Sequence, residues 1–212
     1  MRAALIDYGS GNIASAAKAL SRAAAETSGH EIIVTADPDM VRKSERIILP
    51  GVGAFADCMR GLGAVPGMIE ALNESVIRSG KPILGICVGM QLMATAGREF
   101  GVHLGLNWIE GEVVPLSPAD PALKIPHMGW NEIDLVQNHP VFAGLDEDAN
   151  AYFVHSFEMR PVTATHLLAT TDYGGAVTAA IGRDNIVGTQ FHPEKSQAVG
   201  LKILANFLNW TP

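Results

Sequence analysis

The first half of the chain alternates short apolar runs with segments of helical periodicity. The runs are β-branched or continuously apolar, as strands buried on both faces are, and they predict strands at Ala3–Ile6, Glu31–Thr35, Arg46–Pro50 and Pro82–Ile86. Helical patterns follow the runs, from the turn Gly9–Asn12 through Ala25, at Asp39–Ser44, after Gly53 with a break near Pro66, and from Val88 onward. Because strands and helices take turns, this half predicts a parallel, doubly wound sheet with helices on both faces.

The second half has shorter strand patterns separated by turn residues. We expect strands at Asn107–Leu116, Asn131–Val136, Ala151–Arg160, His166–Thr171, Ala176–Gly182 and Ile186–Gln190. Asp172–Gly175 and Arg183–Asn185 have the composition of hairpin connections, so this half should be partly antiparallel. A helix over about Gln197–Asn209, with Ser196 as its N-cap, should follow. The pattern predicts one α/β domain over residues 1–212.

Composition and charge narrow the function. Hydrophobic residues make up 48% of the chain and charged residues only 17%, a bias that fits a protein whose surface is partly covered by a partner. The net charge of −7 argues against a nucleic-acid partner, because phosphate binding needs a basic face. The seven histidines show no HExxH pattern and no paired Cys/His spacing, so we expect no metal ion and no cofactor.

Two further features bear on the cellular compartment. No apolar run approaches the ~20 residues needed to cross a bilayer, and the apolar stretch at the N-terminus is short for a signal peptide and is interrupted by Asp7. The two cysteines lack CxxC spacing and do not indicate a disulfide scaffold. We therefore expect a cytoplasmic protein with no membrane contact.

Candidate chemistry begins at Gly85-Ile-Cys87-Val-Gly89, where the fourth predicted strand gives way to a helix. The pattern G-x-C-x-G at such a junction has the form of a nucleophile elbow, in which the two glycines let strand and helix approach closely. The Cys87 side chain would then project above the sheet edge at a helix N-terminus, which stabilises a thiolate. A buried structural cysteine is the alternative, and the spacing alone does not decide between the two.

A base for this thiol is found in Gln190-Phe-His192-Pro-Glu194. In an extended backbone residues i and i+2 point the same way, so His192 and Glu194 would share a face, stiffened by the proline between them. A carboxylate beside an imidazole orients the ring and stabilises its charged form.

The loop Leu49-Pro-Gly-Val-Gly53 follows the third strand and should reach Cys87. Its glycines would let a peptide N–H turn toward a developing oxyanion, with the N–H of Val88 as the second donor. Taken alone, the loop is better explained as an ordinary strand–helix turn.

The motifs LPGVGAF, GICVGMQ and FHPEKS, in this order, resemble those of the class I glutamine amidotransferases, the type with a Cys, His and Glu triad. The resemblance implies a flavodoxin-like core, with Cys87 as nucleophile, His192 as general base and acid, and Glu194 as the carboxylate that orients it. It implies oxyanion donors at Val52 and Val88. It also implies a site for L-glutamine formed by Gly51, Gly53, Gln91, His155, Ser156 and Phe157.

Three further segments narrow the resemblance. Asp7–Asn12, Pro126–Asn131 and Tyr152–Ser156 resemble the glutaminase subunit of imidazole glycerol phosphate synthase, and this resemblance covers essentially all 212 residues. It implies that glutamine-derived ammonia passes to a cyclase subunit, a (β/α)₈ barrel, in a heterodimer of histidine biosynthesis. Because tryptophan side chains dominate many binding energies, we expect this subunit to contact Pro126, His127, Met128, Gly129 and Trp130.

Other interpretations stay open at this point. The chain could serve a different synthase or act alone as a γ-glutamyl hydrolase, although the segment Pro126–Trp130 favours a partnered enzyme. Gly9-Ser-Gly-Asn-Ile-Ala14 matches a dinucleotide fingerprint, with Asp37 at the end of the second strand, and allows an oxidoreductase. That alternative leaves the cysteine and the His–Glu pair unexplained.

The glycine-rich loop also predicts a switch. Because glycine tolerates both signs of φ, the peptide between Gly51 and Val52 can rotate at little cost. One orientation presents the Val52 N–H to the oxyanion, whereas the other presents a carbonyl and would keep the free subunit nearly silent. A partner and its ligand could then activate the enzyme by binding the competent orientation more tightly.

Overall fold

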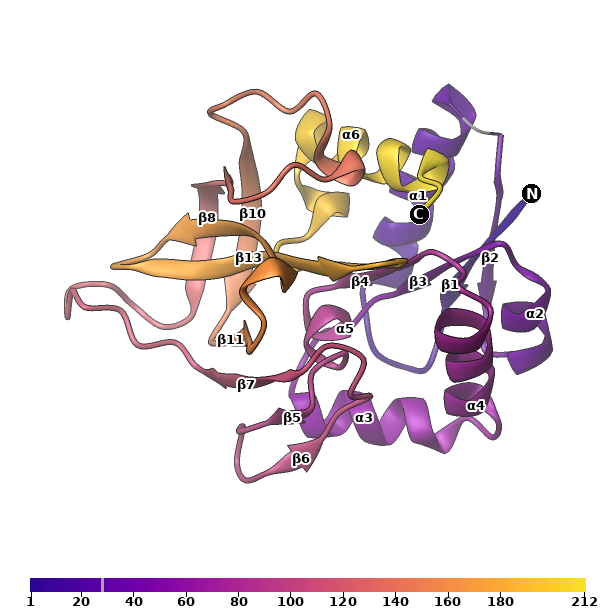
Figure 1. Ribbon diagram of the computed structural model, residues 1–212, viewed down its shortest axis with the longest axis horizontal. Helices are drawn as coiled ribbons and strands as arrows, with labels where there is room; N and C mark the ends of the chain where they lie inside the picture. The colour runs from indigo at the N-terminus through magenta and orange to yellow at the C-terminus, as the bar shows by residue number, and fades with distance from the viewer. Residues whose placement is uncertain (28) are drawn as a thin grey trace.

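A computed structural model describes residues 1–27 and 29–212, and in this part of the chain the central sheet has eight strands in the order β2-β1-β3-β4-β14-β13-β12-β9 (Figure 1). Five neighbouring strands are mutually parallel: β2 (Glu31–Thr35), β1 (Arg2–Ile6), β3 (Arg46–Leu49), β4 (Ile83–Ile86) and β14 (Ile186–Thr189). Three pair antiparallel: β13 (Ala176–Arg183), β12 (Leu167–Asp172) and β9 (Asp134–Leu135). This is the predicted doubly wound, mostly parallel sheet with an antiparallel extension.

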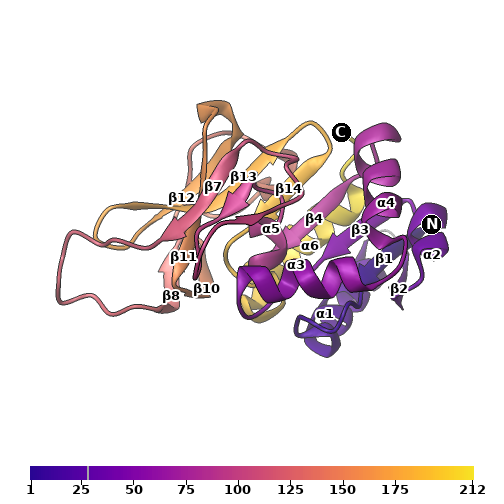
Figure 2. The same cartoon turned by 90° about the horizontal axis from the view of Figure 1, so that it is seen from below.

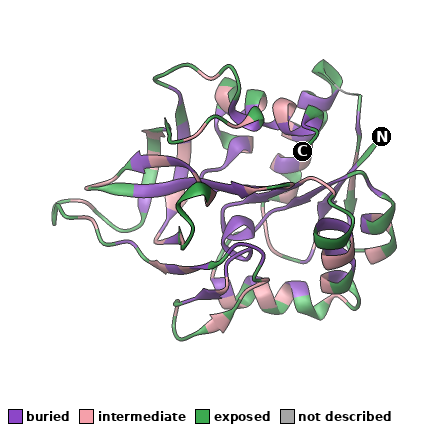
Figure 3. Ribbon diagram, in the orientation of Figure 1, coloured by how far each residue is buried: buried purple, intermediate pink, exposed green. Residues whose placement is uncertain are grey.

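Helices cover both faces of the parallel strands. α1 (Ile13–Glu26) and α6 (Gln197–Asn209) pack together on one face, and the opposite face carries α3 (Phe55–Ala64), α4 (Met68–Leu72) and α5 (Val88–Gln91) (Figures 1 and 2). α2 (Pro38–Lys43) lies beside α4, which continues into a π-helical turn at Asn73–Arg78. The helical break predicted near Pro66 separates α3 from α4. Strands β3, β4 and β14 are buried along their whole length, which explains their continuously apolar sequences (Figure 3).

Two smaller sheets flank the antiparallel end of the central sheet. One has the order β11-β7-β5-β6 and contains β11 (Phe157–Pro161), β7 (Gly111–Pro115), β5 (Ala96–Gly97) and β6 (His103–Leu104). The other is the antiparallel pair β10 (Asn150–His155) and β8 (His127–Glu132). Short 3₁₀ turns occupy Pro140–Phe142, Ala164–His166 and Pro193–Lys195. The long connection between β7 and β8 extends away from the rest of the protein and is mostly exposed (Figures 1 and 3).

Three of the predicted strands differ in their bounds. Residues 107–110 are not a strand, because the N–H groups of Asn107 and Trp108 donate to backbone carbonyls that follow α5. The strand predicted at Asn131–Val136 is divided between β8 and β9, and β8 already begins at His127. The strand predicted at Ala151–Arg160 is broken at Ser156 into β10 and β11. Each break reflects long-range hydrogen bonding that a local apolar pattern does not encode.

Ser196 stands at the predicted N-cap position of α6 but does not cap the helix with its side chain. Its hydroxyl instead donates to the carbonyl of His192 at 2.7 Å and accepts the N–H of Tyr152 at 3.0 Å. The serine therefore joins the start of α6 to strand β10, beside the His–Glu pair.

The elbow between β4 and α5 depends on two glycines. A Cβ atom at Gly89 would lie 1.9 Å from the carbonyl oxygen of Leu49, and one at Gly85 would lie 2.8 Å from backbone atoms of Met90. Only glycine therefore lets α5 approach β3 and β4 this closely. As a consequence, Cys87 is held at the carboxyl edge of the sheet.

Two absences complete the description of the fold. Among residues 1–27 and 29–212, no helix is long and apolar enough to cross a membrane. In the same part of the chain, no group of three or more histidine, cysteine, aspartate or glutamate side chains is arranged to hold a metal ion.

Candidate active site

Cys87 lies at the turn between β4 and α5, with backbone angles φ 53° and ψ −114°. These angles are rare for a residue that has a Cβ, so the surrounding structure must hold them in place. The Cys87 N–H donates to the carbonyl of Thr189, at the end of β14, at 2.8 Å, and its carbonyl accepts the N–H groups of Met90 and Gln91. The residue is 4% exposed and lines a cavity. The structure thus has the predicted elbow geometry.

His192 and Glu194 follow β14, the strand next to the elbow. His192 Nδ1 and Glu194 Oε1 are 2.8 Å apart, and both side chains are almost fully buried. The backbone is not extended here, contrary to the sequence prediction, because Pro193–Lys195 forms a 3₁₀ turn. The turn brings the carboxylate back to the imidazole, so the predicted contact forms through a different local geometry.

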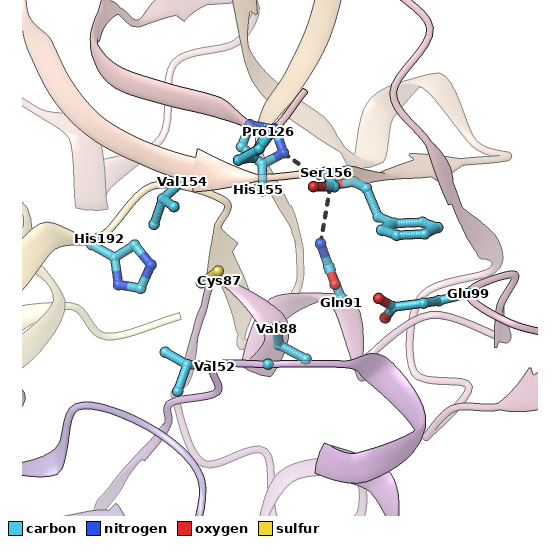
Figure 4. A pocket seen from close by; sticks show the side chains of 12 residues that line it. Val52, Cys87, Val88, Gln91, Glu99, Pro126, Val154, His155, Ser156 and His192 are labelled. Atoms are coloured by element: carbon cyan, nitrogen blue, oxygen red, sulfur yellow. Dashed lines mark hydrogen bonds between the residues drawn. The ribbon is translucent and has the colours of Figure 1, made fainter. Parts of the chain in front are cut away.

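The His192 ring lies beside the Cys87 sulfur (Figure 4). Among the described residues, Nε2 of His192 has no partner that meets the criteria of a hydrogen bond. The pKa of His192 is nevertheless raised to about 9, because the neighbouring Cys87 and Glu194 outweigh burial, which by itself favours the neutral ring. A proton taken from the thiol would therefore be held firmly on this imidazole.

Both predicted oxyanion donors are engaged within the protein. The Val88 N–H donates to the carbonyl of Gly51 at 3.3 Å, and the Val52 N–H donates to Oγ of Ser10 at 3.2 Å. The peptide between Gly51 and Val52 therefore directs its carbonyl toward Val88 and its N–H away from it. This is the orientation in which the loop offers a carbonyl where an oxyanion would need a donor.

The hydroxyl of Ser10 holds the loop in this orientation from the turn after β1. It donates to the carbonyl of Val52 at 2.7 Å in addition to accepting the Val52 N–H. The thiol of Cys58, in α3, lies 3.1 Å from the Ser10 hydroxyl and 3.4 Å from the Val52 carbonyl. Burial raises the pKa of Cys58, so this thiol stays protonated and can act as a donor.

A cavity of about 310 Å³ opens between the elbow and strand β10 (Figure 4). Of the six residues predicted to bind glutamine, five line this cavity, and Gly51 instead lines a separate cavity beside Asn12 and Pro50. The complete wall consists of Val52, Gly53, Cys87, Val88, Gln91, Glu99, Pro126, Val154, His155, Ser156, Phe157 and His192. Cys87, His192 and five of the predicted glutamine-binding residues therefore meet at one cavity.

Glu99 is a cavity residue that the sequence interpretation missed. It lies in the connection between β5 and β6, and its Oε2 accepts the N–H of Phe55 at 2.8 Å. Its side chain points into the cavity from the side opposite His192 (Figure 4). No motif marks this position, because only the packing of the short β5–β6 sheet beside α3 brings the carboxylate here.

His155 contributes to the cavity wall as a neutral ring. Its Nδ1 lies 2.9 Å from the carbonyl of Phe157, and its Nε2 lies 3.0 Å from Nδ1 of His127. Burial is the main cause that lowers the pKa of both histidines to about 4. A ring this resistant to protonation is poorly suited to be the base for a thiol, which favours His192 for that role.

The segment predicted to contact a partner forms the first part of β8. Met128 and Trp130 are 62% and 49% exposed, and Pro126 is exposed at the rim of the cavity. His127 differs from the prediction, because its ring is buried between Phe153 and Tyr173 and is not available to a partner. The exposed positions alternate along the strand, as side chains in a strand do.

Curated proteins of known name are similar to this chain over its whole length. The "Imidazole glycerol phosphate synthase subunit HisH" of Rhodospirillum rubrum is 58% identical over 214 residues and covers 100% of both chains. The subunit of the same name from Brucella suis is 57% identical, and the match covers 100% of both chains. The one from Caulobacter vibrioides is 58% identical, and the match covers 99% of this chain and 98% of the other.

Solved structures share the fold at lower sequence identity. A structure titled "Crystal structure of glutamine amidotransferase" matches with a TM-score of 0.72 at 15% identity, covering 98% of this chain and 99% of the other. The crystal structure of a glutamine amidotransferase from Thermotoga maritima matches with a TM-score of 0.63 at 14% identity, covering 92% and 76%. The family model "Glutamine amidotransferase class-I" matches residues 4–210. The chain therefore belongs to the class I glutamine amidotransferase family.

Proposed function

We propose that this chain is the glutaminase subunit of an imidazole glycerol phosphate synthase. It hydrolyses L-glutamine to L-glutamate and ammonia, and the ammonia serves a cyclase subunit that makes imidazole glycerol phosphate and an aminoimidazole carboxamide ribonucleotide. The observation that carries the proposal is a cysteine on a strained elbow beside a buried His192–Glu194 pair, at the wall of one cavity. The full-length similarity to the HisH subunits supports this synthase over another one.

Acylation uses the three residues in fixed roles. His192 takes the thiol proton of Cys87, and the thiolate attacks the carboxamide carbon of glutamine, which forms a C–S bond and moves one electron pair onto the oxygen. The intermediate collapses when His192 returns the proton to the nitrogen, the C–N bond breaks and ammonia leaves. Glu194 orients the ring and stabilises its charged form throughout.

Deacylation repeats the same transfers with water as the nucleophile. His192 takes a proton from the water molecule while the water oxygen attacks the γ-glutamyl thioester on Cys87. The C–S bond then breaks, the thiolate regains its proton from His192, and glutamate leaves with a new γ-carboxyl group.

The far end of the cavity fits the amino-acid part of the substrate. Glu99 is the carboxylate of the cavity wall on that side, and the hydrogen bond from Phe55 leaves its second oxygen available for the α-ammonium of glutamine. Gln91 and the backbone from His155 to Phe157 lie between Glu99 and Cys87, where they can orient the substrate chain.

The cyclase partner is best placed on the exposed part of β8. Met128 and Trp130 present apolar side chains next to Pro126, at the rim of the cavity in which ammonia is released. Exposed apolar groups rimming a site are typical of interaction surfaces. A heterodimer through this face would place the partner close to the point at which ammonia is made.

The hydrogen bonds of the glycine-rich loop support the predicted switch. In the observed orientation the Gly51 carbonyl occupies the Val88 N–H, so the free subunit has an incomplete oxyanion hole. Rotation of this same peptide, between Gly51 and Val52, would free the Val88 N–H, break the bond from the Val52 N–H to Ser10 and bring the Val52 N–H to the oxyanion. Losing one oxyanion donor lowers kcat by ~10²–10³, so partner-driven rotation would raise kcat far more than it lowers KM.

The dinucleotide alternative is less consistent with the structure. A Cβ atom at Gly11 would lie 3.1 Å from Pro50, so this glycine lets the turn after β1 contact the loop after β3. Ser10 in the same turn binds that loop. Gly11 of the fingerprint is thus explained by packing against the loop after β3, and Gly9 by its positive φ of 81°.

The Cys87→Ala variant tests the proposed function. With the cyclase partner present, glutamine-dependent synthesis should be lost while synthesis from added ammonium salts continues, because the acceptor of ammonia lies on the partner. A glutamine analogue with an electrophilic side chain should label Cys87 and spare Cys58. Equal loss of both synthetic activities would contradict the separation of the two sites.

A further inference from the structure

Gln190 lies beside the catalytic sulfur and has no assigned role in the reaction described above. It is the first residue after β14 and is 0% exposed. Its Nε2 donates to Sγ of Cys87 at 3.7 Å, within the range of hydrogen bonds to sulfur. Its Oε1 accepts Nε2 of Gln91 at 3.0 Å. Both ends of a fully buried amide are therefore used inside the active site.

The direction of this amide is fixed by a backbone carbonyl. Gln91 donates from the same Nε2 to the carbonyl of Phe157 at 3.1 Å, and that carbonyl can only accept (Figure 4). A 180° flip of the Gln91 side-chain amide would place its oxygen against the Phe157 carbonyl. A flip of the Gln190 amide alone would place its NH₂ group against the NH₂ group of Gln91. The network is satisfied in one arrangement, and in that arrangement an N–H group of Gln190 faces the sulfur.

A donor at this position suits the charged form of the nucleophile. Hydrogen bonds to charged groups are stronger than those between neutral groups, so the bond from Gln190 strengthens when His192 removes the thiol proton. It weakens when the sulfur becomes part of a thioester, and it strengthens again when the thiolate leaves during deacylation. Because the amide is already oriented, it needs no reorganisation at either step.

We propose that Gln190 is a further residue of the catalytic site, whose side-chain N–H stabilises the Cys87 thiolate while its oxygen positions Gln91. The proposal rests on Cys87 being the nucleophile, as in the proposed function. The Gln190 amide links the two walls of the cavity. It contacts the Cys87 sulfur on one side and, through Gln91, the Phe157 carbonyl of β11 on the other.

Three variants separate the two contacts of Gln190. Gln190→Met keeps the length of the side chain and removes both of its polar groups. Gln91→Leu removes the partner of the Gln190 oxygen and leaves the donor beside the sulfur. Thr189→Val is the matched control, since Thr189 is equally buried and adjacent but its hydroxyl binds the Phe191 carbonyl at 3.0 Å.

The experiment follows alkylation of Cys87 by iodoacetamide as a function of pH, with the labelled peptide identified by mass spectrometry. The midpoint pH of Cys87 labelling should rise by roughly one unit in Gln190→Met, the shift expected for loss of one hydrogen bond to a charged sulfur. It should move little in Gln91→Leu, in which KM for glutamine rises instead. Thr189→Val should match the wild type in both measurements.

The outcomes distinguish this proposal from the proposed function. An unshifted midpoint in a folded Gln190→Met variant overturns the role of the donor, even if the melting temperature or KM changes. If Gln190→Met does not fold, Gln190→Leu is measured in the same way and decides the question. A wild-type enzyme that keeps its glutaminase activity after complete alkylation of Cys87 overturns the nucleophile assignment and this proposal together.

Discussion

The two walls of the active-site cavity are held by different kinds of interaction. On the elbow wall, Cys87 is fixed by backbone hydrogen bonds and by glycines that allow close contact between strand and helix. On the wall of β10 and β11, side chains hold the position: His155 and Gln91 both bind the carbonyl of Phe157, and His127 supports His155. The first wall depends on backbone contacts, from Thr189 and Leu49 as well as within the turn, whereas the second depends on hydrogen bonds made by side chains.

The elbow wall should be the more sensitive to a single methyl group. Gly89→Ala places a Cβ atom 1.9 Å from the Leu49 carbonyl, so we expect a loss of stability above ~4 kcal/mol or no folded protein. Gly63→Ala is the matched control, because its Cβ in helix α3 meets only a side-chain atom of Ile69 at 3.7 Å. It should stabilise the protein by ~0.5–1 kcal/mol. A thermal melt of Gly89→Ala that resembles the wild type would contradict this account of the elbow.

His192 is the proposed base at the cavity wall, and its loss should have the largest effect on the reaction itself. His192→Ala should lower the glutaminase rate by ~10²–10⁴, the usual contribution of a positioned general base. Glu194→Gln should lower it less, because this carboxylate only orients and stabilises the ring. Steady-state glutaminase assays with the partner present measure both effects. A rate unchanged in His192→Ala would move attention to His155 despite its lowered pKa.

Trp130 tests whether the exposed side of β8, the strand paired with β10, contacts the partner. The side chain is 49% exposed, so Trp130→Ala should leave the melting temperature of the isolated subunit nearly unchanged. Binding to the cyclase subunit should weaken by at least ~2 kcal/mol, which is about 30-fold in Kd. Titration calorimetry with the cyclase subunit measures the Kd, and a thermal melt of the isolated subunit measures its melting temperature. A large fall in melting temperature with unchanged binding would instead mark Trp130 as part of the core.

Ser10 should influence the glutaminase activity through its bonds to Val52 in the glycine-rich loop. Ser10→Ala removes the hydroxyl that bonds both the N–H and the carbonyl of Val52, so the competent orientation becomes easier to reach. With net hydrogen-bond contributions of ~0.5–1.5 kcal/mol, glutaminase activity of the free subunit should rise by about tenfold. The activation by the partner should shrink by a similar factor. Lower basal activity in a stable variant would contradict the role of Ser10 in holding the loop.

A fall in pH should destabilise the part of the protein around His127 in β8 and His155 in β10 before it affects the elbow. Burial lowers the pKa of His127 and His155 to about 4, below the value of 6.5 expected in the unfolded chain. The unfolded chain then binds more protons in this range, so the free energy of unfolding should fall as the pH drops from about 6.5 toward 4. Urea denaturation at several pH values measures this slope. His127→Phe removes one titrating ring, and its slope should be smaller; an equal slope would exclude His127 as a cause.

The sequence predicted the parts of the site that rest on local geometry. The pattern of glycines around Cys87 predicted the elbow, and the spacing of His192 and Glu194 predicted their contact, although the turn that produces it is 3₁₀ and not extended. Most strands of the parallel half agree to within a residue, because strands buried on both faces carry a continuous apolar signal.

The sequence by itself determined the doubly wound core, the nucleophile elbow and the family to which the chain belongs. Only the tertiary structure decided that Glu99 enters the cavity, that Gln190 faces the sulfur, that His127 is buried and that Ser10 holds the loop after β3. The physical reason is the range of the interactions. Backbone sterics and apolar periodicity act between residues close in sequence, whereas these four side chains find their partners across strands that are distant in the chain.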